Sequence, residues 1–166
     1  MATALFVSRD EIVKFTALNG NIDTDNFIQW VKVAQDIHLQ NYLGTKLFNK
    51  INNDIVAGTL TGNYLTLTNV YIKPMLIHWS MVEFLPFASY TIANKGVYKH
   101  NSENSDTVSK EEIDFLVEKE RSIAESYSRR FIDYMSFNQS LFPEYNTNSN
   151  ADVYPEKDSY FAGWQL

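Results

Sequence analysis

The sequence predicts an all-α protein, a small helical bundle with a bent central helix, a short loop or β-hairpin excursion and an extended C-terminal tail. Three observations favour this fold class. One long stretch is apolar on nearly all sides, two capping boxes open helical patterns, and turn-forming residues separate the patterns. A chain of 166 residues is also long enough to bury a core within one domain.

The stretch Val70–Ile92 is predicted to be the central helix, because 15 of its 23 residues are aliphatic, aromatic or methionine. A helix that is apolar all round belongs in a membrane or in the middle of a bundle. The bundle is favoured, since an acid such as Glu83 near mid-bilayer costs about 2.5–3.5 kcal/mol. Pro74 is tolerated near the start of the helix, whereas Pro86 should kink the helix or end it early.

Two helices are expected before this stretch. Ser8 and Glu11 form a capping box, which predicts a helix over residues 9–17 that Asn19-Gly20 ends. Thr24 is the expected N-cap of the next helix, which Gly44 stops near residue 43. One face of this helix is marked at helical spacing by a mainly apolar stripe of Phe27, Trp30, Val31, Ala34, Ile37 and Asn41.

Residues 45–57 are predicted to form another short helix, with Gly58 in the left-handed position after it. The threonine-rich residues 59–68 indicate a loop. After the central helix, Asn94-Lys95-Gly96 is a turn signal, and Val97 and Tyr98 are compatible with a small β-hairpin.

The clearest amphipathic pattern covers residues 110–136, where Ser109 and Glu112 form a second capping box. This helix is expected to be the longest and to pack along the central one. Glu120 is the one residue that fits the apolar stripe poorly. The stripe consists of Ile113, Leu116, Val117, Ile123, Ala124, Tyr127, Phe131, Tyr134 and Met135.

After Leu141-Phe142-Pro143 the composition changes, so we divide the chain into a helical body, residues 1–142, and a tail, residues 143–166. Residues 144–158 contain few apolar side chains and are expected to be extended. A disordered terminus is the default for a chain end. Large apolar side chains on acidic spacers instead favour a docking segment, either intermolecular or folded back on the body. They are Tyr154, Tyr160, Phe161, Trp164 and Leu166.

The residue chemistry contains no catalytic, metal or cofactor motif, and we expect a non-enzymatic protein without a cofactor. There are no cysteines. His38, His78 and His100 lack partners at metal-ligand spacing, so His78 is interpreted as a core histidine and Glu83 as a buried hydrogen-bonding acid or an interface residue. The net charge of −6 disfavours a phosphate-binding surface, and the first residues do not form a signal peptide.

The order of these elements carries a family resemblance. A short capped helix comes first, followed by a helix that closes on Tyr42-Leu43-Gly44-Thr45-Lys46-Leu47, a central apolar helix, a turn-rich excursion and a long amphipathic helix. Phe142-Pro143-Glu144-Tyr145 and a terminal Gly163-Trp164-Gln165-Leu166 complete the pattern. Over nearly its whole length the chain resembles the head–tail connector, or adaptor, proteins of tailed bacteriophages. It is most similar to versions in phages and prophages of gut Bacteroidota, including crAss-like phages.

The resemblance implies a structural virion protein that forms a ring, dodecameric by analogy, at the portal vertex. The ring would join the head to the tail and line the channel through which genomic DNA passes without specific binding. Its partners would be further copies of itself, the portal protein and the next neck or tail ring protein, with no membrane. The protein would be located in the virion neck, and in the host cytoplasm during assembly. The alternative is a non-viral helical interaction module whose aromatic tail binds a partner. The predicted interface residues are Lys95, Tyr98, Lys99, Tyr154, Tyr160, Phe161, Trp164 and Leu166.

Overall fold

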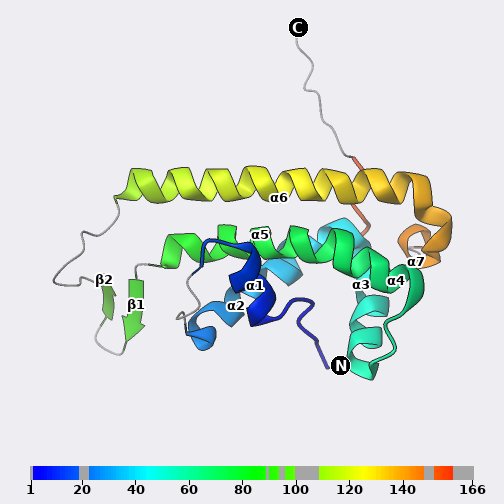
Figure 1. Ribbon diagram of the computed structural model, residues 1–166, viewed down its shortest axis with the longest axis horizontal. Coiled ribbons are helices and arrows are strands. Elements are labelled where there is room, and N and C mark those ends of the chain that lie inside the picture. The colour runs from blue at the N-terminus through cyan, green and yellow to red at the C-terminus, as the bar shows by residue number, and fades with distance from the viewer. Residues whose placement is uncertain are drawn as a thin grey trace, which may run out of the picture.

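The computed structural model describes residues 2–18, 23–88, 90–93, 96–99, 109–147 and 152–158, which form an all-α bundle. The long helix α6 (Lys110–Asn138) runs along one edge, antiparallel to the central helix α5 (Lys73–Phe84) (Figure 1). Helices α1 (Arg9–Phe15) and α2 (Thr24–Ala34) lie on the other side of α5, and α3 (Gln40–Ala57) packs against residues 143–146. Helix α5 is therefore covered on both sides, as its sequence predicts.

The N-terminal helices begin as local sequence dictates. The predicted capping box at Ser8 and Glu11 opens α1, with Glu11 N–H donating to Ser8 Oγ at 3.3 Å. Asp23, rather than the expected Thr24, caps α2, because its carboxylate accepts from Asp25 N–H. A π-helical turn, η1 (Gln35–Leu39), joins α2 to α3. This wider turn rotates the apolar stripe, so that Ile37, an expected stripe residue, is exposed.

Helix α3 has a break inside it at Gly44, whose φ of 72° and ψ of 157° are not helical. The predicted stop at Gly44 is confirmed, and the second part of α3 corresponds to the predicted helix over residues 45–57. It ends at Gly58, which is left-handed as expected, with φ of 67°.

The predicted loop over residues 59–68 is confirmed for residues 59–61 and was wrong for the remainder. Helix α4 (Gly62–Leu67) continues through a second π-helical turn, η2 (Thr68–Ile72), into α5. Leu67 is fully buried, and the Thr68 hydroxyl donates to the carbonyl of Tyr64. Tertiary packing therefore outweighs the weak helix propensity of the threonines here.

Pro86 ends the central helix, one of the two effects expected of it. The α-helix stops at Phe84, and a short 3₁₀ turn, η3 (Leu85–Phe87), follows. The chain then forms an antiparallel hairpin of β1 (Tyr90–Ala93) and β2 (Gly96–Lys99), in which Tyr90 pairs with Lys99. The last residues of the predicted helix thus form a strand instead.

Helix α6 opens with the predicted capping box at Ser109 and Glu112. Its buried residues lie only between Ala124 and Met135, so the first turns are exposed or half-buried. Leu116, a member of the predicted apolar stripe, is 44% exposed. After a 3₁₀ turn, η4 (Gln139–Leu141), the short helix α7 (Pro143–Asn146) forms where extended chain was expected.

Polar side chains inside the bundle hold the N-terminal segment in place. Buried Gln35 accepts from Phe6 N–H at 3.0 Å and donates to the carbonyl of Ala4 at 2.8 Å. Asn52 accepts from Ala4 N–H and donates to the carbonyl of Ala2. Both amides use their donor and their acceptor, which is the condition under which a buried amide does not destabilise the fold.

Candidate interaction site

Residues 152–158, here called the strap, run back across the body in extended form and cover the break in α3. The carbonyl of Val153 accepts from Thr45 N–H at 3.0 Å, and Val153 N–H donates to the Thr45 hydroxyl at 2.9 Å. Glu156 N–H donates to the carbonyl of Asn41 at 2.8 Å. These bonds bracket Gly44 on both sides. The described part of the tail is therefore folded back onto its own subunit.

Gly44 lets the strap approach this closely. Pro155 is buried against it, and a Cβ atom at position 44 would lie 2.6 Å from Cδ of Pro155. The backbone conformation at Gly44 is also one that only glycine adopts readily. The glycine that breaks the helix is thus also the contact point for the strap, more than a hundred residues later in the chain.

Tyr145 supports the strap from beneath. Its side chain is 2% exposed, packs edge-on against the ring of Phe131 and donates to the carbonyl of Glu156 at 3.4 Å. The ammonium of Lys157 lies over the Tyr145 ring, 4.8 Å from its centroid. Burial, with the nearby Tyr154 and Glu156, raises the pKa of the Tyr145 hydroxyl to about 12. Because Tyr145 belongs to the core, the body extends beyond the predicted boundary at residue 142.

A second contact fixes α7 on the body. The Tyr64 hydroxyl donates to the carboxylate of Glu144 at 2.6 Å, and its ring packs edge-on against buried Phe142. Burial and the adjoining Glu144 carboxylate raise the pKa of the Tyr64 hydroxyl. Helix α7 is therefore held by an aromatic and a polar contact, which keeps the start of the strap in one position.

The predicted interface residues fall in separate places. Tyr154 lies in the strap and is 59% exposed, so it is presented outward from a fixed segment. The backbone of Tyr98 and Lys99 lies in β2, and the hairpin and the strap are at opposite ends of the bundle (Figure 1). The structure therefore does not bring these two regions together. The other predicted residues lie outside the described residues: Lys95, Tyr160, Phe161, Trp164 and Leu166.

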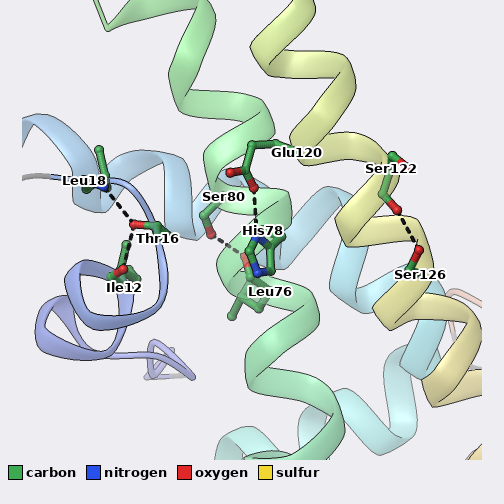
Figure 2. Close-up of polar contacts among 9 residues, drawn as sticks. All are labelled: Ile12, Thr16, Leu18, Leu76, His78, Ser80, Glu120, Ser122 and Ser126. Atoms are coloured by element: carbon green, nitrogen blue, oxygen red, sulfur yellow. Dashed lines mark hydrogen bonds and ion pairs between the residues drawn. The ribbon is translucent and has the colours of Figure 1, made fainter.

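Two histidine–glutamate pairs join α5 to its neighbours. His78 Nδ1 lies 2.7 Å from Glu120 Oε2 of α6 (Figure 2), and His38 Nε2 of η1 lies 2.7 Å from Glu83 Oε1 of α5. Both pairs are partly buried. The Glu120 that disturbs the apolar stripe of α6 is therefore the partner of His78, and Glu83 is a hydrogen-bonding acid, one of its two expected roles.

Between these pairs Trp79 connects three elements. The His38 ring stacks on its indole, with ring centroids 4.0 Å apart, and the indole N–H donates to Ser128 Oγ of α6 at 3.0 Å. Sequence spacing could not reveal these contacts, because each pair joins residues more than forty positions apart. Because each carboxylate is already bonded to a histidine of another element, the pairs are best explained as structural bonds between helices.

A cavity of about 570 Å³ opens beside the ion pair of Glu11 and Lys73, which joins α1 to the start of α5. Its apolar lining residues are Phe15, Pro74, Ile77 and Tyr127. Burial alone would raise the pKa of the Glu11 carboxyl, but bonds from Lys73 and Ser8 outweigh burial and hold the pKa below its usual value. The cavity therefore combines apolar walls with polar groups, which are Asn69, His78 and the Glu11–Lys73 ion pair.

We expect the Glu11–Lys73 pair to make stability depend on pH in the acid range. A carboxyl whose pKa is lowered by folding stabilises the fold above its unfolded pKa and loses that contribution as the pH falls through its folded value. Lys73→Gln should therefore destabilise the protein at pH 7, by at most about 1 kcal/mol because the pair is near solvent. Urea unfolding at pH 7 and pH 3 should show the difference shrinking at the lower pH. A difference that is equal at both pH values would contradict this account.

Within the described residues, no three metal-ligating side chains come together, and no helix is long and apolar enough to cross a membrane. Residues 39–155 match the model of a family of unknown function, DUF6712. The matched segment begins in η1 and ends at Pro155, so it contains both the Gly44 break and the proline that packs on it. No curated protein matches the chain. No solved structure matches it either.

Proposed function

The chain belongs to DUF6712, a family of unknown function, and from its architecture we propose that it is a head–tail connector of a tailed bacteriophage. In this role it forms a ring at the portal vertex that joins the head to the tail. Its partners are further copies of itself, the portal protein and the next neck or tail ring protein. Genomic DNA passes through the ring without specific binding. The protein acts as a structural component of the virion rather than as an enzyme.

One observation carries the proposal. Two of the three short motifs on which the resemblance to connectors rests are remote in sequence but adjoin the same strap. The strap lies on the Gly44 turn, and Tyr145 of the Phe-Pro-Glu-Tyr step packs beneath it. A ring protein must present its tail to neighbours from a fixed position. Bonds at Val153 and Glu156 provide this, because they leave Tyr154 facing outward.

Two further features support a ring. The N-terminal turns of α6 extend beyond the buried part of the helix, and the side chain of Leu116 in these turns is 44% exposed. Such a surface is suited to contact with an adjacent subunit. The net charge of −6 suits a channel through which DNA must slide, since tight binding to phosphates needs a basic surface.

The experiment that tests the proposal is quantitative mass spectrometry of purified particles of a phage that encodes this chain. Scaled against the major capsid protein, the chain is expected at roughly a dozen copies per particle, the number that one dodecameric ring at a single vertex contributes. Electron cryomicroscopy of the portal vertex would then place the ring. Absence of the chain from mature particles would overturn the proposal.

The exposed Tyr154 also supports a second candidate, a helical interaction module outside the virion that binds its partner through the aromatic tail. The two candidates differ in genomic and physical context. A gene beside those for portal and capsid proteins, and a chain found in the particle, favour the connector. A chain that is absent from particles but captures one defined host protein, and loses it on Tyr154→Ala, favours the interaction module.

A further inference from the structure

The outer face of α6, which points away from α5, has a symmetric pattern of residues. Figure 2 shows Ser122 and Ser126 on this face, while Glu120 points the other way, to His78. Along the face the residues are spaced by four, three, four, four, three and four positions, a spacing that reads the same in both directions. All seven are exposed: Phe115, Lys119, Ser122, Ser126, Arg130, Asp133 and Phe137.

The residue types match at two of the three pairs of mirror positions, and the third places Ser122 opposite Arg130. Phe115 and Phe137 lie eleven residues to either side of Ser126, and they are among the most exposed large apolar side chains described, at 69% and 88%. Lys119 and Asp133 lie seven residues to either side and carry opposite charges. Neither has an ion-pair partner among the described residues.

From this pattern we propose that the outer face of α6 is a homodimer surface, on which two copies pack their α6 helices antiparallel about a two-fold axis at Ser126. In that register Phe115 of each copy meets Phe137 of the other, and Lys119 of each meets Asp133 of the other. A two-fold axis places each residue opposite its mirror position in sequence, so every favourable pair occurs twice. The serines in the middle let the two backbones approach closely.

The occupant is a second copy because the face complements itself. A face with one sign of charge would point to a partner of opposite charge, whereas Lys119 and Asp133 carry opposite signs at equal distances from the centre of this face. Phe115 and Phe137 are about 33 Å apart along the helix, at 1.5 Å per residue. Only another antiparallel helix of similar length matches both phenylalanines and both charges together. The stripe repeats every eleven residues, about 3.67 residues per turn, so it drifts slowly around α6 in the sense of a right-handed pairing of helices.

This contact goes beyond the connector role and does not depend on it. A two-fold contact closes at two copies, whereas a ring needs a contact between two different surfaces of the subunit. The dimer is thus a state of the free protein, and it covers two exposed phenylalanines that would otherwise face water.

Analytical ultracentrifugation of charge variants tests the pairing. The protein is expected to dimerise with a micromolar Kd. Lys119→Asp and Asp133→Lys should each weaken dimerisation by about tenfold, because each places like charges opposite one another twice. The double variant should return the Kd to within about threefold of the starting protein, since it restores both pairs in reverse. Glu125→Lys, an exposed reversal on another face of α6, is the matched control and should leave the Kd unchanged.

The antiparallel register has its own test, because the chain has no cysteine and a single one can be introduced cleanly. Ser126→Cys lies at the proposed axis, so oxidation should join two copies rapidly. Ser122→Cys lies on the same face but places the two thiols about 12 Å apart in this register, too far for a disulfide, whereas a parallel pair would bring them together. Equal cross-linking of both variants would indicate parallel helices and overturn the proposal. So would a monomer at about 100 µM, or two single reversals whose effects the double variant does not cancel.

Discussion

Tyr145→Ala is expected to lower the free energy of unfolding by about 3–5 kcal/mol, the range for removing a buried aromatic side chain. The ring fills the space between α7 and α6, where it packs on Phe131, and it is 2% exposed. Its removal leaves a cavity and also withdraws the support of the strap. Urea-induced unfolding followed by circular dichroism measures the change.

Two matched variants distinguish the contribution of the Tyr145 ring to stability from that of its hydroxyl, and from the effect of substituting any exposed residue of the strap. Tyr145→Phe keeps the ring and loses only a long hydrogen bond to the carbonyl of Glu156, so its effect should stay below about 1 kcal/mol. Tyr154→Ala removes an exposed tyrosine of the same strap and should change stability by no more than about 0.5 kcal/mol. If Tyr145→Ala were as mild as either control, Tyr145 would not be a core residue.

The parts of this fold that the sequence predicts are those set by neighbouring residues. The capping boxes at Ser8 and Ser109 mark the starts of α1 and α6, and Pro86 marks the end of α5. Each is a local matter of backbone hydrogen bonds or ring sterics. The strong apolar character of the central stretch likewise predicts its burial on both sides.

The errors arise where distant residues decide the local structure. Residues 59–68 carry loop-forming composition, yet α4 forms because Leu67 is buried and Tyr64 contacts Phe142 and Glu144. Glu120 interrupts the apolar stripe of α6 because its partner, His78, lies on another helix. A single sequence shows that such residues fit the local helical pattern poorly, but it does not show the distant partner that stabilises them there.

The candidate site shows the same division. Sequence patterns identify Gly44 as a helix stop and the tail as a docking segment, but they do not show that these are one feature. Only the folded chain places Pro155 on Gly44. The spacing of Tyr154 and the later aromatic residues predicts docking without naming the surface. Residues 152–158 dock on their own subunit, and docking of the segment beyond them on a neighbour stays a prediction.

Gly44→Ala is expected to release the strap and to destabilise the protein by at least about 2 kcal/mol. Two costs add. The backbone at Gly44 has φ of 72° and ψ of 157°, a conformation that costs other residues about 1–3 kcal/mol. The new methyl group would also lie 2.6 Å from Cδ of Pro155, so the strap has to move away. Hydrogen exchange followed by NMR should show loss of protection at the Glu156 amide, which donates to Asn41 in the docked strap.

Gly58→Ala is the matched control for backbone strain. Gly58 also has a positive φ, of 67°, but nothing lies within 4 Å of a Cβ atom built there. This variant should cost about 1 kcal/mol, the usual penalty for alanine in the left-handed region, and leave the Glu156 amide protected. If both variants behaved alike, strain alone would explain Gly44, and its contact with Pro155 would have no energetic importance.

A second substitution at position 155 isolates the contact itself. Pro155→Ala removes the Cγ and Cδ atoms that the new methyl group meets, while the strained backbone of residue 44 stays the same. In the Gly44→Ala background it should therefore restore part of the protection at Glu156, although alone it weakens the strap. Pro155→Ala would thus lower the protection of the Glu156 amide in the unchanged protein and raise it in the Gly44→Ala variant. This reversal of sign is expected of residues in direct contact. If the two effects were simply additive, the strap would not be held at the Gly44 turn in solution, and the fixed exit of the tail that supports the connector proposal would be lost.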